Sequence, residues 1–277
     1  MNNIMDGVGA SLTLKKKIAN EIKQKNLTPC LAVIQVGDNK TSDIYVRNKN
    51  KACDMVGIKF INIKLPDTIS EDLIISEIER LNLDDNVNGI LVQLPLPPCF
   101  DEGRIINTIS PVKDVDGLTY PNVGNLENEC LVSCTPMGVM ELLDMYNVSL
   151  KGKNACIVGR SNLVGKPLIQ LLLARDATVS ICHSKSLDIK SYTKMADVLI
   201  VAAGHPNLIT KDMVKEGAVV IDVGINKEND SLVGDVSFDE VSKKASLITP
   251  VPGGVGPMTI ASLLKNVVKA YKFQNGK

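Results

Sequence analysis

The fold is decided by the stretch Ala155-Cys156-Ile157-Val158-Gly159-Arg160-Ser161-Asn162-Leu163-Val164-Gly165-Lys166-Pro167. A short apolar run, a glycine-containing turn and a helical pattern with an early proline predict a strand, a tight turn and a helix. Short β-branched runs alternate with longer helical patterns through nearly the whole chain. This alternation is typical of α/β proteins with parallel sheets.

The same patterns predict the other elements of the chain. Several of the apolar runs lack polar residues, so we expect strands that are covered on both faces. Pro136 suits the first turn of a helix over 137–146, which places a domain boundary near 135–136. A closing helix is expected over 258–273. The predicted strands span residues 30–36, 59–64, 89–93, 155–159, 178–182, 198–202, 218–223 and 246–248.

The turn after residues 155–158 is similar to a dinucleotide-binding turn with one glycine missing. Gly159 occupies the first glycine position, Ser161 the middle one, and Gly165 arrives one residue late. The free amides and the dipole at the start of the following helix attract phosphate. A glycine-containing turn that binds no ligand is the alternative interpretation.

The residues after the strand over 178–182 indicate which dinucleotide is favoured. An NAD site usually carries Asp or Glu there, which binds the ribose 2′-hydroxyl. This chain has Cys182-His183-Ser184-Lys185 instead, without a carboxylate. Arg160 in the turn adds a cation that is able to bind phosphate with two hydrogen bonds. The pattern favours NADP over NAD.

Composition and charge exclude several classes of partner. The 277 residues include 31 Lys+Arg and 31 Asp+Glu, so the formal net charge is zero and no long-range field collects nucleic acid or anionic lipid. No apolar run approaches the roughly 20 residues that span a bilayer, and the first residues lack the order of a signal peptide. We therefore expect a cytoplasmic protein with a small-molecule ligand.

The seven cysteines are scattered and odd in number, and most lie inside apolar patterns. That distribution is typical of reduced core thiols. Cys130 and Cys134 have the spacing of a metal-binding pair, but no second Cys or His pair accompanies them, so we predict no metal site.

A predicted helix in the first part of the chain carries a lysine among apolar residues. With Thr41 or Ser42 as N-cap, Lys49 falls on the apolar face, one turn after Tyr45. A lysine there must extend to solvent, form a pair or line a cavity. Partial burial would lower its pKa and allow proton transfer near neutral pH. The predicted apolar face consists of Ile44, Tyr45, Ala52, Met55 and Val56.

Three other segments place polar or bare backbone groups where ligands bind. Gln93 stands at the carboxyl end of a buried strand, where open α/β sheets hold their ligands. Asp114 and Asp116 lie in an irregular segment before Gly117, which is consistent with an Asx-type turn or with a carboxylate that binds a heterocycle. The segment 251–259 has three glycines and two prolines, which suit a close approach of backbone to a ligand or an ordinary strand-to-helix turn.

Taken together, the motifs closely resemble the bifunctional methylenetetrahydrofolate dehydrogenase/methenyltetrahydrofolate cyclohydrolase family. They follow the family's order and span almost the whole chain. The matching segments are Tyr45-Val46-x-x-Lys49-x-Lys51-Ala52, Gly89-Ile90-Leu91-Val92-Gln93-Leu94-Pro95-Leu96, Lys113-Asp114-Val115-Asp116-Gly117, Gly159-Arg160-Ser161 with Val164-Gly165-Lys166-Pro167, Asp222-Val223-Gly224-Ile225-Asn226, and Pro252-Gly253-Gly254-Val255-Gly256-Pro257-Met258-Thr259.

The resemblance implies an α/β fold of two lobes, linked by two long helices, with a cleft between them. Residues 1–135, completed by the closing helix over 258–277, would form a catalytic and folate-binding domain, and 136–257 a Rossmann-type NADP-binding domain. The implied reactions in that cleft are oxidation of 5,10-methylenetetrahydrofolate with NADP+ and hydrolysis of the methenyl product to 10-formyltetrahydrofolate. A homodimer through the cofactor domain is also implied, with folates as the partners.

Residue roles follow from the same resemblance. Lys49 would move protons, Gln93 would hydrogen-bond Lys49 and help to set its protonation, Tyr45 would pack along the folate, and Asp116 would bind the pterin. Pro252, Gly253 and Gly254 would present bare backbone beside the substrate and nicotinamide rings. The implied cofactor-binding residues are Gly159, Arg160, Ser161, Gly165, Ser184, Lys185 and Ile225.

Three alternatives compete with this interpretation. Tyr45 and Lys49 have the spacing of the Tyr/Lys pair in short-chain dehydrogenases, but that pair follows the glycine-rich turn, whereas here it precedes it. A two-lobed dehydrogenase of the shikimate type would not explain Gln93 together with Asp116. A non-catalytic NADP-responsive module would bind NADP while Lys49 was dispensable for turnover.

Overall fold

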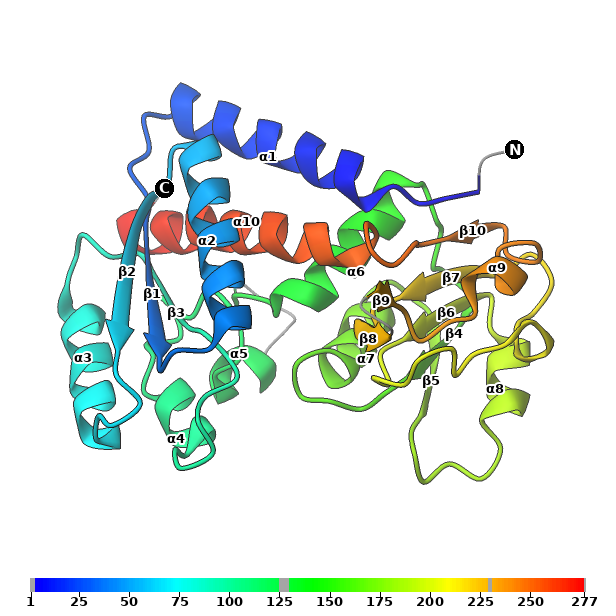
Figure 1. Cartoon of the computed structure of the whole chain (residues 1–277). Coiled ribbons are helices and arrows are strands. Elements are labelled where there is room, and N and C mark those ends of the chain that lie inside the picture. Colours follow the sequence, from blue (N-terminus) through cyan, green and yellow to red (C-terminus); the bar gives the residue numbers. More distant parts are fainter. Residues whose placement is uncertain (1–2, 125–129, 229–230, 277) are drawn as a thin grey trace. The chain divides into compact units, whose positions relative to one another are not determined.

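The computed structural model describes residues 3–124, 130–228 and 231–276 (Figure 1). The chain divides into two compact units, each built from segments that are distant in sequence. Met1–Ser11 and Thr135–Thr259 form one unit, which we call the glycine-turn unit because it contains Gly159. Leu12–Cys134 and Ile260–Lys277 form the other, which we call the lysine unit because it contains Lys49.

The lysine unit is built on a three-stranded parallel sheet in the order β2-β1-β3. All residues of β1 (Cys30–Val36) and β3 (Gly89–Val92) are buried, whereas β2 (Lys59–Leu65) lies at an edge and is partly exposed. Buried parallel strands require apolar side chains on both faces, which explains the nearly continuous apolar sequences of β1 and β3. Helices α2 (Lys40–Val56), α3 (Glu71–Leu83) and α4 (Glu102–Asn107) follow these strands, and α5 (Tyr120–Gly124) comes later.

Helix α2 begins earlier than the sequence predicts. Its N-cap is Asn39, whose side chain accepts hydrogen bonds from the amides of Thr41 at 2.9 Å and Ser42 at 3.2 Å. The prediction that Thr41 or Ser42 caps the helix was therefore wrong. Asparagine competes equally well for this position, and it stands nearer to the end of β1. The helix ends at Gly57, whose positive φ of 84° suits a left-handed C-cap.

The apolar face of α2 was also predicted incorrectly in part. Ile44, Tyr45 and Met55 are 54%, 43% and 60% exposed, respectively. The buried stripe is displaced around the helix, and it includes Ser42 as well as apolar residues. A helix with apolar side chains on more than half of its circumference fits its sheet in several rotations, so tertiary packing selects the buried face. The buried residues of α2 are Ser42, Val46, Ala52, Cys53 and Val56.

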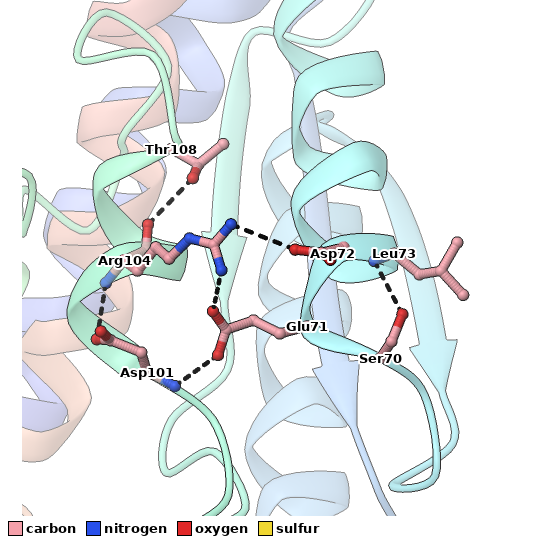
Figure 2. A network of polar contacts seen from close by, with 7 residues as sticks. All are labelled: Ser70, Glu71, Asp72, Leu73, Asp101, Arg104 and Thr108. Carbon is pink, nitrogen blue, oxygen red and sulfur yellow. Dashed lines mark hydrogen bonds and ion pairs between the residues drawn. The ribbon is translucent and has the colours of Figure 1, made fainter.

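An ionic network on the surface of the lysine unit joins α3 to α4 (Figure 2). Arg104 donates to Glu71 at 2.7 Å and to Asp72 at 3.2 Å. Glu71 also accepts the backbone amide of Asp101 at 2.8 Å, and Asp101 caps α4 by accepting the Arg104 amide at 3.0 Å. The network thus fixes the start of α4 against α3.

The glycine-turn unit contains a five-stranded parallel sheet in the order β10-β7-β6-β4-β5. The chain enters at β4, passes to β5 on one side, and then returns to β6, β7 and β10 on the other. Such a reversal is the topological switch point at which doubly wound sheets bind ligands. The strands are β4 (Asn154–Val158), β5 (Thr178–Cys182), β6 (Val198–Val201), β7 (Val219–Asp222) and β10 (Leu247–Ile248).

Short helical elements and a hairpin complete the glycine-turn unit. They are α7 (Gly165–Leu173), α8 (Ile189–Met195), the 3-10 helix η1 (Lys211–Met213), α9 (Phe238–Val241), and the antiparallel pair β8 (Asn226–Glu228) and β9 (Ser231–Val233). All eight predicted strands are confirmed within one residue at each end. The hairpin was not predicted, because its strands have three residues each and no apolar alternation.

Three further helices, α1 (Gly7–Gln24), α6 (Cys134–Met145) and α10 (Val255–Asn275), contain residues of both units. The closing helix α10 begins three residues before the predicted start, so Gly256 and Pro257 lie in its first turn. Proline is tolerated there because the first helical amides have no intrahelical acceptor. No helix in the described ranges is long and apolar enough to cross a membrane.

Candidate active site

In the lysine unit, Lys49 and Gln93 are in direct contact. The Lys49 ammonium donates a hydrogen bond to Gln93 Oε1 at 2.8 Å. Gln93 follows β3 immediately, and its own side-chain amide donates to the carbonyl of Leu94 at 2.7 Å. The backbone amide of Gln93 donates to Ile34 of β1 at 2.8 Å. These bonds orient the carboxamide so that its oxygen faces the lysine on α2.

The environment of Lys49 shifts its protonation equilibrium. Its side chain is half-buried, and this burial lowers the pKa of the ammonium below its ordinary value. The nearby carboxylate of Asp116 and the thiols of Cys134 and Cys53 act in the opposite direction with smaller effect. A lysine whose pKa is lowered by burial is suited to transfer protons near neutral pH.

The two aspartates of the 113–117 segment have different surroundings. Asp114 is buried and accepts hydrogen bonds from the amides of Gly117 at 3.0 Å and Thr119 at 2.8 Å, and from Asn122 Nδ2 at 2.9 Å. Burial raises the pKa of Asp114 in spite of these bonds. Asp116 is only partly buried and lies beside Lys49 and Cys134. Asp114 therefore holds the turn around Gly117 through amides three and five residues on, while Asp116 lies near enough to the lysine to influence its charge.

Cys134 also belongs to the cluster around Lys49 and Asp116, and the sequence did not predict its place there. Its thiol is buried, lies against Asp116, and donates to the carbonyl of Val115 at 3.3 Å. Burial raises the pKa of the thiol well above its ordinary value, so the group is a neutral thiol. Asn266 of α10 donates to the carbonyls of Val115 and Val132, both at 2.8 Å, and so fixes the segments on either side of Asp116.

Tyr45 lies on α2 one turn before Lys49, and the residue is 43% exposed. An exposed aromatic ring next to a half-buried lysine offers a flat apolar surface to a planar ligand. The structure thus brings Lys49, Gln93 and Asp116 together and places Tyr45 at their margin.

In the glycine-turn unit, the two glycines of the turn after β4 are required by close packing. Gly159 has a φ of +130°, and a Cβ there would lie 2.1 Å from the carbonyl oxygen of Ala202 after β6. A Cβ on Gly165 would lie 2.2 Å from the carbonyl oxygen of Gly159. Gly165 therefore permits the close helix-to-strand packing of the dinucleotide fold, although it comes one residue late.

The start of α7 is arranged to receive an anion. The N-cap residue, Val164, provides no side-chain hydrogen bond to the helix. Ser161 accepts the Val164 amide at 3.2 Å and shapes the turn, and Arg160 beside it is exposed. Backbone amides at a helix start and an adjacent guanidinium are groups that bind phosphate.

The turn after β5 is held by its own hydrogen bonds. The amide of Lys185 donates to His183 Nδ1 at 3.1 Å, and Ser186 accepts the His183 amide at 3.0 Å. Ser184 and Lys185 are thereby left exposed, and no carboxylate stands among the five residues after the strand. This donor set, hydroxyl and ammonium without a carboxylate, fits a ribose 2′-phosphate.

In the segment before α10, backbone conformation and local packing within the unit already require glycine at two positions. Gly253 has a φ of +104°, which side chains rarely adopt. A Cβ on Gly254 would lie 2.6 Å from the carbonyl oxygen of Pro250, so local packing alone requires that glycine. Pro252 is exposed. A ligand-contacting role for these three residues remains a prediction.

Comparison with known proteins resolves the choice between the remaining classes of enzyme. The model described as "Tetrahydrofolate dehydrogenase/cyclohydrolase, catalytic domain" matches residues 5–116, and that described as "Tetrahydrofolate dehydrogenase/cyclohydrolase, NAD(P)-binding domain" matches 133–275. The chain belongs to the tetrahydrofolate dehydrogenase/cyclohydrolase family. The resemblance inferred from the motifs is thereby confirmed.

Relatives of this family match along their whole lengths. "Bifunctional protein FolD" of Nitratiruptor sp. is 53% identical over 275 residues, covering 97% of this chain and 98% of the relative. The solved structure of the bifunctional enzyme FolD from Campylobacter jejuni is 49% identical, with a TM-score of 0.95 and coverage of 98% of each chain. The Trypanosoma brucei enzyme, solved with NADP cofactor and inhibitor, is 37% identical, with a TM-score of 0.94, covering 99% of this chain and 98% of its own.

Within this family assignment, the sequence-predicted cofactor residues do not all lie together. Gly159 and Gly165 are in contact, and Ser184 and Lys185 follow β5, the neighbour of β4. Ile225 follows β7, which is separated from β4 by β6. Its 52% exposed side chain lies at the start of α10, with Cδ1 about 4.0 Å from where a Cβ on Gly256 would stand.

Proposed function

We propose that this member of the tetrahydrofolate dehydrogenase/cyclohydrolase family performs two consecutive reactions of one-carbon metabolism. The first oxidises 5,10-methylenetetrahydrofolate to the methenyl cation with NADP+, and the second hydrolyses that cation to 10-formyltetrahydrofolate. The observation that carries the proposal is the half-buried Lys49, with its lowered pKa, bonded to Gln93 and beside Asp116. Hydrolysis requires a group that transfers protons beside the substrate, and this cluster provides one.

Hydrolysis is the step in which side chains of the protein move protons. Water adds to the methenyl carbon and loses a proton. The resulting hydroxyl then loses its proton as the bond from that carbon to the pterin N5 breaks, and N5 gains one, so one proton is released overall. Lys49 is proposed to carry these protons, since burial favours its neutral amine and so allows it to alternate between the two protonation states. Gln93 holds the Lys49 nitrogen in place, because its Oε1 accepts a hydrogen bond from the charged ammonium and from the neutral amine alike.

Substrate orientation is proposed to involve Asp116 and Tyr45. A carboxylate accepts paired N–H donors such as the amino and ring N–H groups of a pterin, and these bonds are charge-assisted. Asp116 is partly buried near Lys49, so a pterin bound there would present its reactive end toward the lysine. The exposed ring of Tyr45 would cover the face of the substrate.

NADP is the proposed cofactor, and as hydride acceptor it supplies the redox chemistry of the first reaction. Arg160, Ser161, Ser184 and Lys185 are proposed to bind its phosphates, and Gly159 and Gly165 to allow the close packing that shapes the turn against which the cofactor lies. Ile225, Pro252, Gly253 and Gly254 are proposed contacts for the reacting rings. The domain division at 135–136, a homodimer through the cofactor domain and a cytoplasmic location complete the proposal.

Absorbance measurements test the two activities separately. Mixing the protein with 5,10-methylenetetrahydrofolate and NADP+ should produce NADPH absorbance, and NAD+ should be a poorer acceptor. Pre-formed methenyltetrahydrofolate should lose its own absorbance faster with the protein than without it. Failure to reduce either dinucleotide would refute the dehydrogenase function, and an unchanged rate of methenyl loss would refute the hydrolase function.

A further inference from the structure

Asp235 is a buried carboxylate whose hydrogen-bonding capacity is filled by three backbone amides and one side-chain amide. The residue is 0% exposed. Its Oδ2 accepts the amides of Ala203 at 2.6 Å and Gly204 at 2.9 Å, and its Oδ1 accepts the amide of His205 at 2.9 Å. Asn226 Nδ2 donates to Oδ1 at 2.8 Å. Three consecutive amides thus converge on one carboxylate, which fixes the path of the segment after β6.

A second buried carboxylate fixes Asp235 itself. Asp222, the last residue of β7, accepts the amide of Asp235 at 3.0 Å on Oδ1 and the amide of Val236 at 2.9 Å on Oδ2. The neighbouring glycines pack closely against the two carboxylates. A Cβ on Gly224 would lie 2.2 Å from Asp235 Cγ, and one on Gly234 would lie 1.9 Å from Asp222 Oδ2. The two carboxylates and the backbone around them form one closely packed assembly.

The segment held by Asp235 forms one side of the dinucleotide crevice expected in this fold. Strand order reverses between β4 and β6, and doubly wound sheets bind dinucleotides outside the carboxyl ends of the strands at such a point. The Gly159 turn follows β4, and residues 203–205 follow β6. The Gly159 turn also packs directly on the carbonyl of Ala202. Adenosine contacts are expected near β4 and β5, which leaves the β6 side for the nicotinamide half.

We propose that Asp235 is a positioning residue for NADP, acting through the backbone of Ala203, Gly204 and His205. The inference rests on the proposed function, because it assumes that the crevice binds this cofactor. Asp235 itself does not touch the ligand. Its carboxylate holds the wall of the crevice in the bound conformation before the cofactor arrives, so that binding does not have to order this segment.

Asp235→Asn is the primary test, because asparagine has the same shape but replaces one accepting oxygen with a donor. We expect the dissociation constant for NADP+, measured by titration calorimetry, to rise about tenfold or more, in line with the loss of charge-assisted bonds. KM for NADP+ should rise with it, while KM for methylenetetrahydrofolate and the rate of methenyl hydrolysis without cofactor stay within about twofold of the parent. Asp239→Asn, an exposed aspartate on α9, is the matched control and should change none of these values.

Two outcomes would overturn the inference. One is an Asp235→Asn protein that hydrolyses methenyltetrahydrofolate normally and binds NADP+ with parental affinity. If that variant fails to fold, Asn226→Ala removes only one of the four donors, and we expect it to weaken NADP+ binding about threefold; parental affinity in Asn226→Ala is then the second overturning outcome. The parent protein is measured first, and its failure to bind NADP+ would refute the proposed function instead.

Discussion

The two units each hold a buried or half-buried charge near the carboxyl ends of parallel strands, but they use its hydrogen-bonding capacity differently. Within the described residues, the Lys49 ammonium has one hydrogen-bond acceptor, Gln93, although it carries three donors. Asp235 accepts four hydrogen bonds, which is about the full capacity of a carboxylate. One charge therefore keeps capacity for a substrate or water, and the other has none left.

This difference distinguishes Lys49, which can take part in a reaction, from Asp235, which holds the surrounding backbone in place. A charge with spare donors in a partly desolvated site is held at some cost in stability, and its pKa moves toward the value that proton transfer needs. A carboxylate whose oxygens are occupied by fixed donors stabilises one loop conformation and has no acceptor site left for a ligand. Changing Lys49 should therefore affect chemistry, and changing Asp235 should affect affinity.

The largest effect is expected from Lys49→Met, which keeps an unbranched side chain one atom shorter and removes the amine. Methenyl hydrolysis should fall by about 10²- to 10⁴-fold, the usual contribution of a positioned acid or base. NADP+ affinity should stay unchanged, because Lys49 and the Gly159 turn belong to different units. Lys51→Met, an exposed lysine two residues further along α2, is the control and should hydrolyse normally. Parental hydrolysis in Lys49→Met would refute the assignment of proton transfer to this residue.

Removing a cation from the turns after β4 and β5 should have a smaller effect, confined to one cofactor. We expect Arg160→Ala or Lys185→Ala to raise KM for NADP+ by about tenfold, equivalent to the loss of one charge-assisted phosphate contact. KM for NAD+ should not change, because NAD+ lacks the 2′-phosphate. Steady-state rates with each dinucleotide check this, and Lys194→Ala on α8 is the matched exposed control. An equal rise in KM for both cofactors would show that these cations do not bind the 2′-phosphate.

Gln93→Glu tests whether the partner of Lys49 sets its protonation. A carboxylate in hydrogen-bonding distance favours the charged ammonium, so the pKa of Lys49 should rise from its lowered value. The rate of hydrolysis measured against pH should then reach its plateau at higher pH, by about one to two units. Gln93→Leu removes the acceptor without adding charge, and its profile should not move to higher pH. Identical profiles for all three proteins would mean that Lys49 does not limit the rate by its ionisation.

The contribution of Asp222 to the free energy of unfolding should depend on pH. Burial raises the pKa of Asp222 to about 6 and outweighs the hydrogen bonds from Asp235, Val236 and Gly224 that lower it. The folded chain then keeps a proton that the unfolded chain has lost, so this residue's contribution is complete below about pH 4 and is lost as pH rises to about 6. Its size is about 2 to 3 kcal/mol. Urea unfolding at several pH values should show this slope in the parent protein and in Asp239→Asn, but not in Asp222→Asn. If the free energy of unfolding changed with pH in the same way in all three proteins, the role assigned to Asp222 would be wrong.

The features that the sequence predicted are those with a local cause. Strand positions follow from continuous apolar runs, and the fold class follows from their alternation with helical patterns. Gln93 and the Gly159 turn were identified because each stands directly after such a run. The family and its two reactions followed from the order of several motifs, which the comparisons confirm.

The features that the sequence did not predict depend on contacts between distant segments. Cys134 joins Asp116 and Lys49 only because three segments meet, and its spacing from Cys130 suggested a different chemistry. The partners of Asp235 are mainly backbone amides, which leave no side-chain pattern to recognise. The rotation of α2 was mistaken because Ile44, Tyr45 and Met55 are apolar yet exposed, and only packing decides among such faces.

The smallest effect is expected where charges are paired at the surface, as in the network of Figure 2. Arg104 is 56% exposed in its side chain and pairs with Glu71 and Asp72, so water and salt screen the attraction. Arg104→Ala should lower Tm by only about 1–2 °C, and raising the salt to about 1 M should remove most of the difference from the parent. Hydrolysis and NADP+ affinity should not change. A Tm loss above about 5 °C that persists in salt would show that an exposed pair fixes α4 as firmly as buried backbone donors fix the Asp235 loop, and the distinction between saturated buried charges and paired surface charges would then fail.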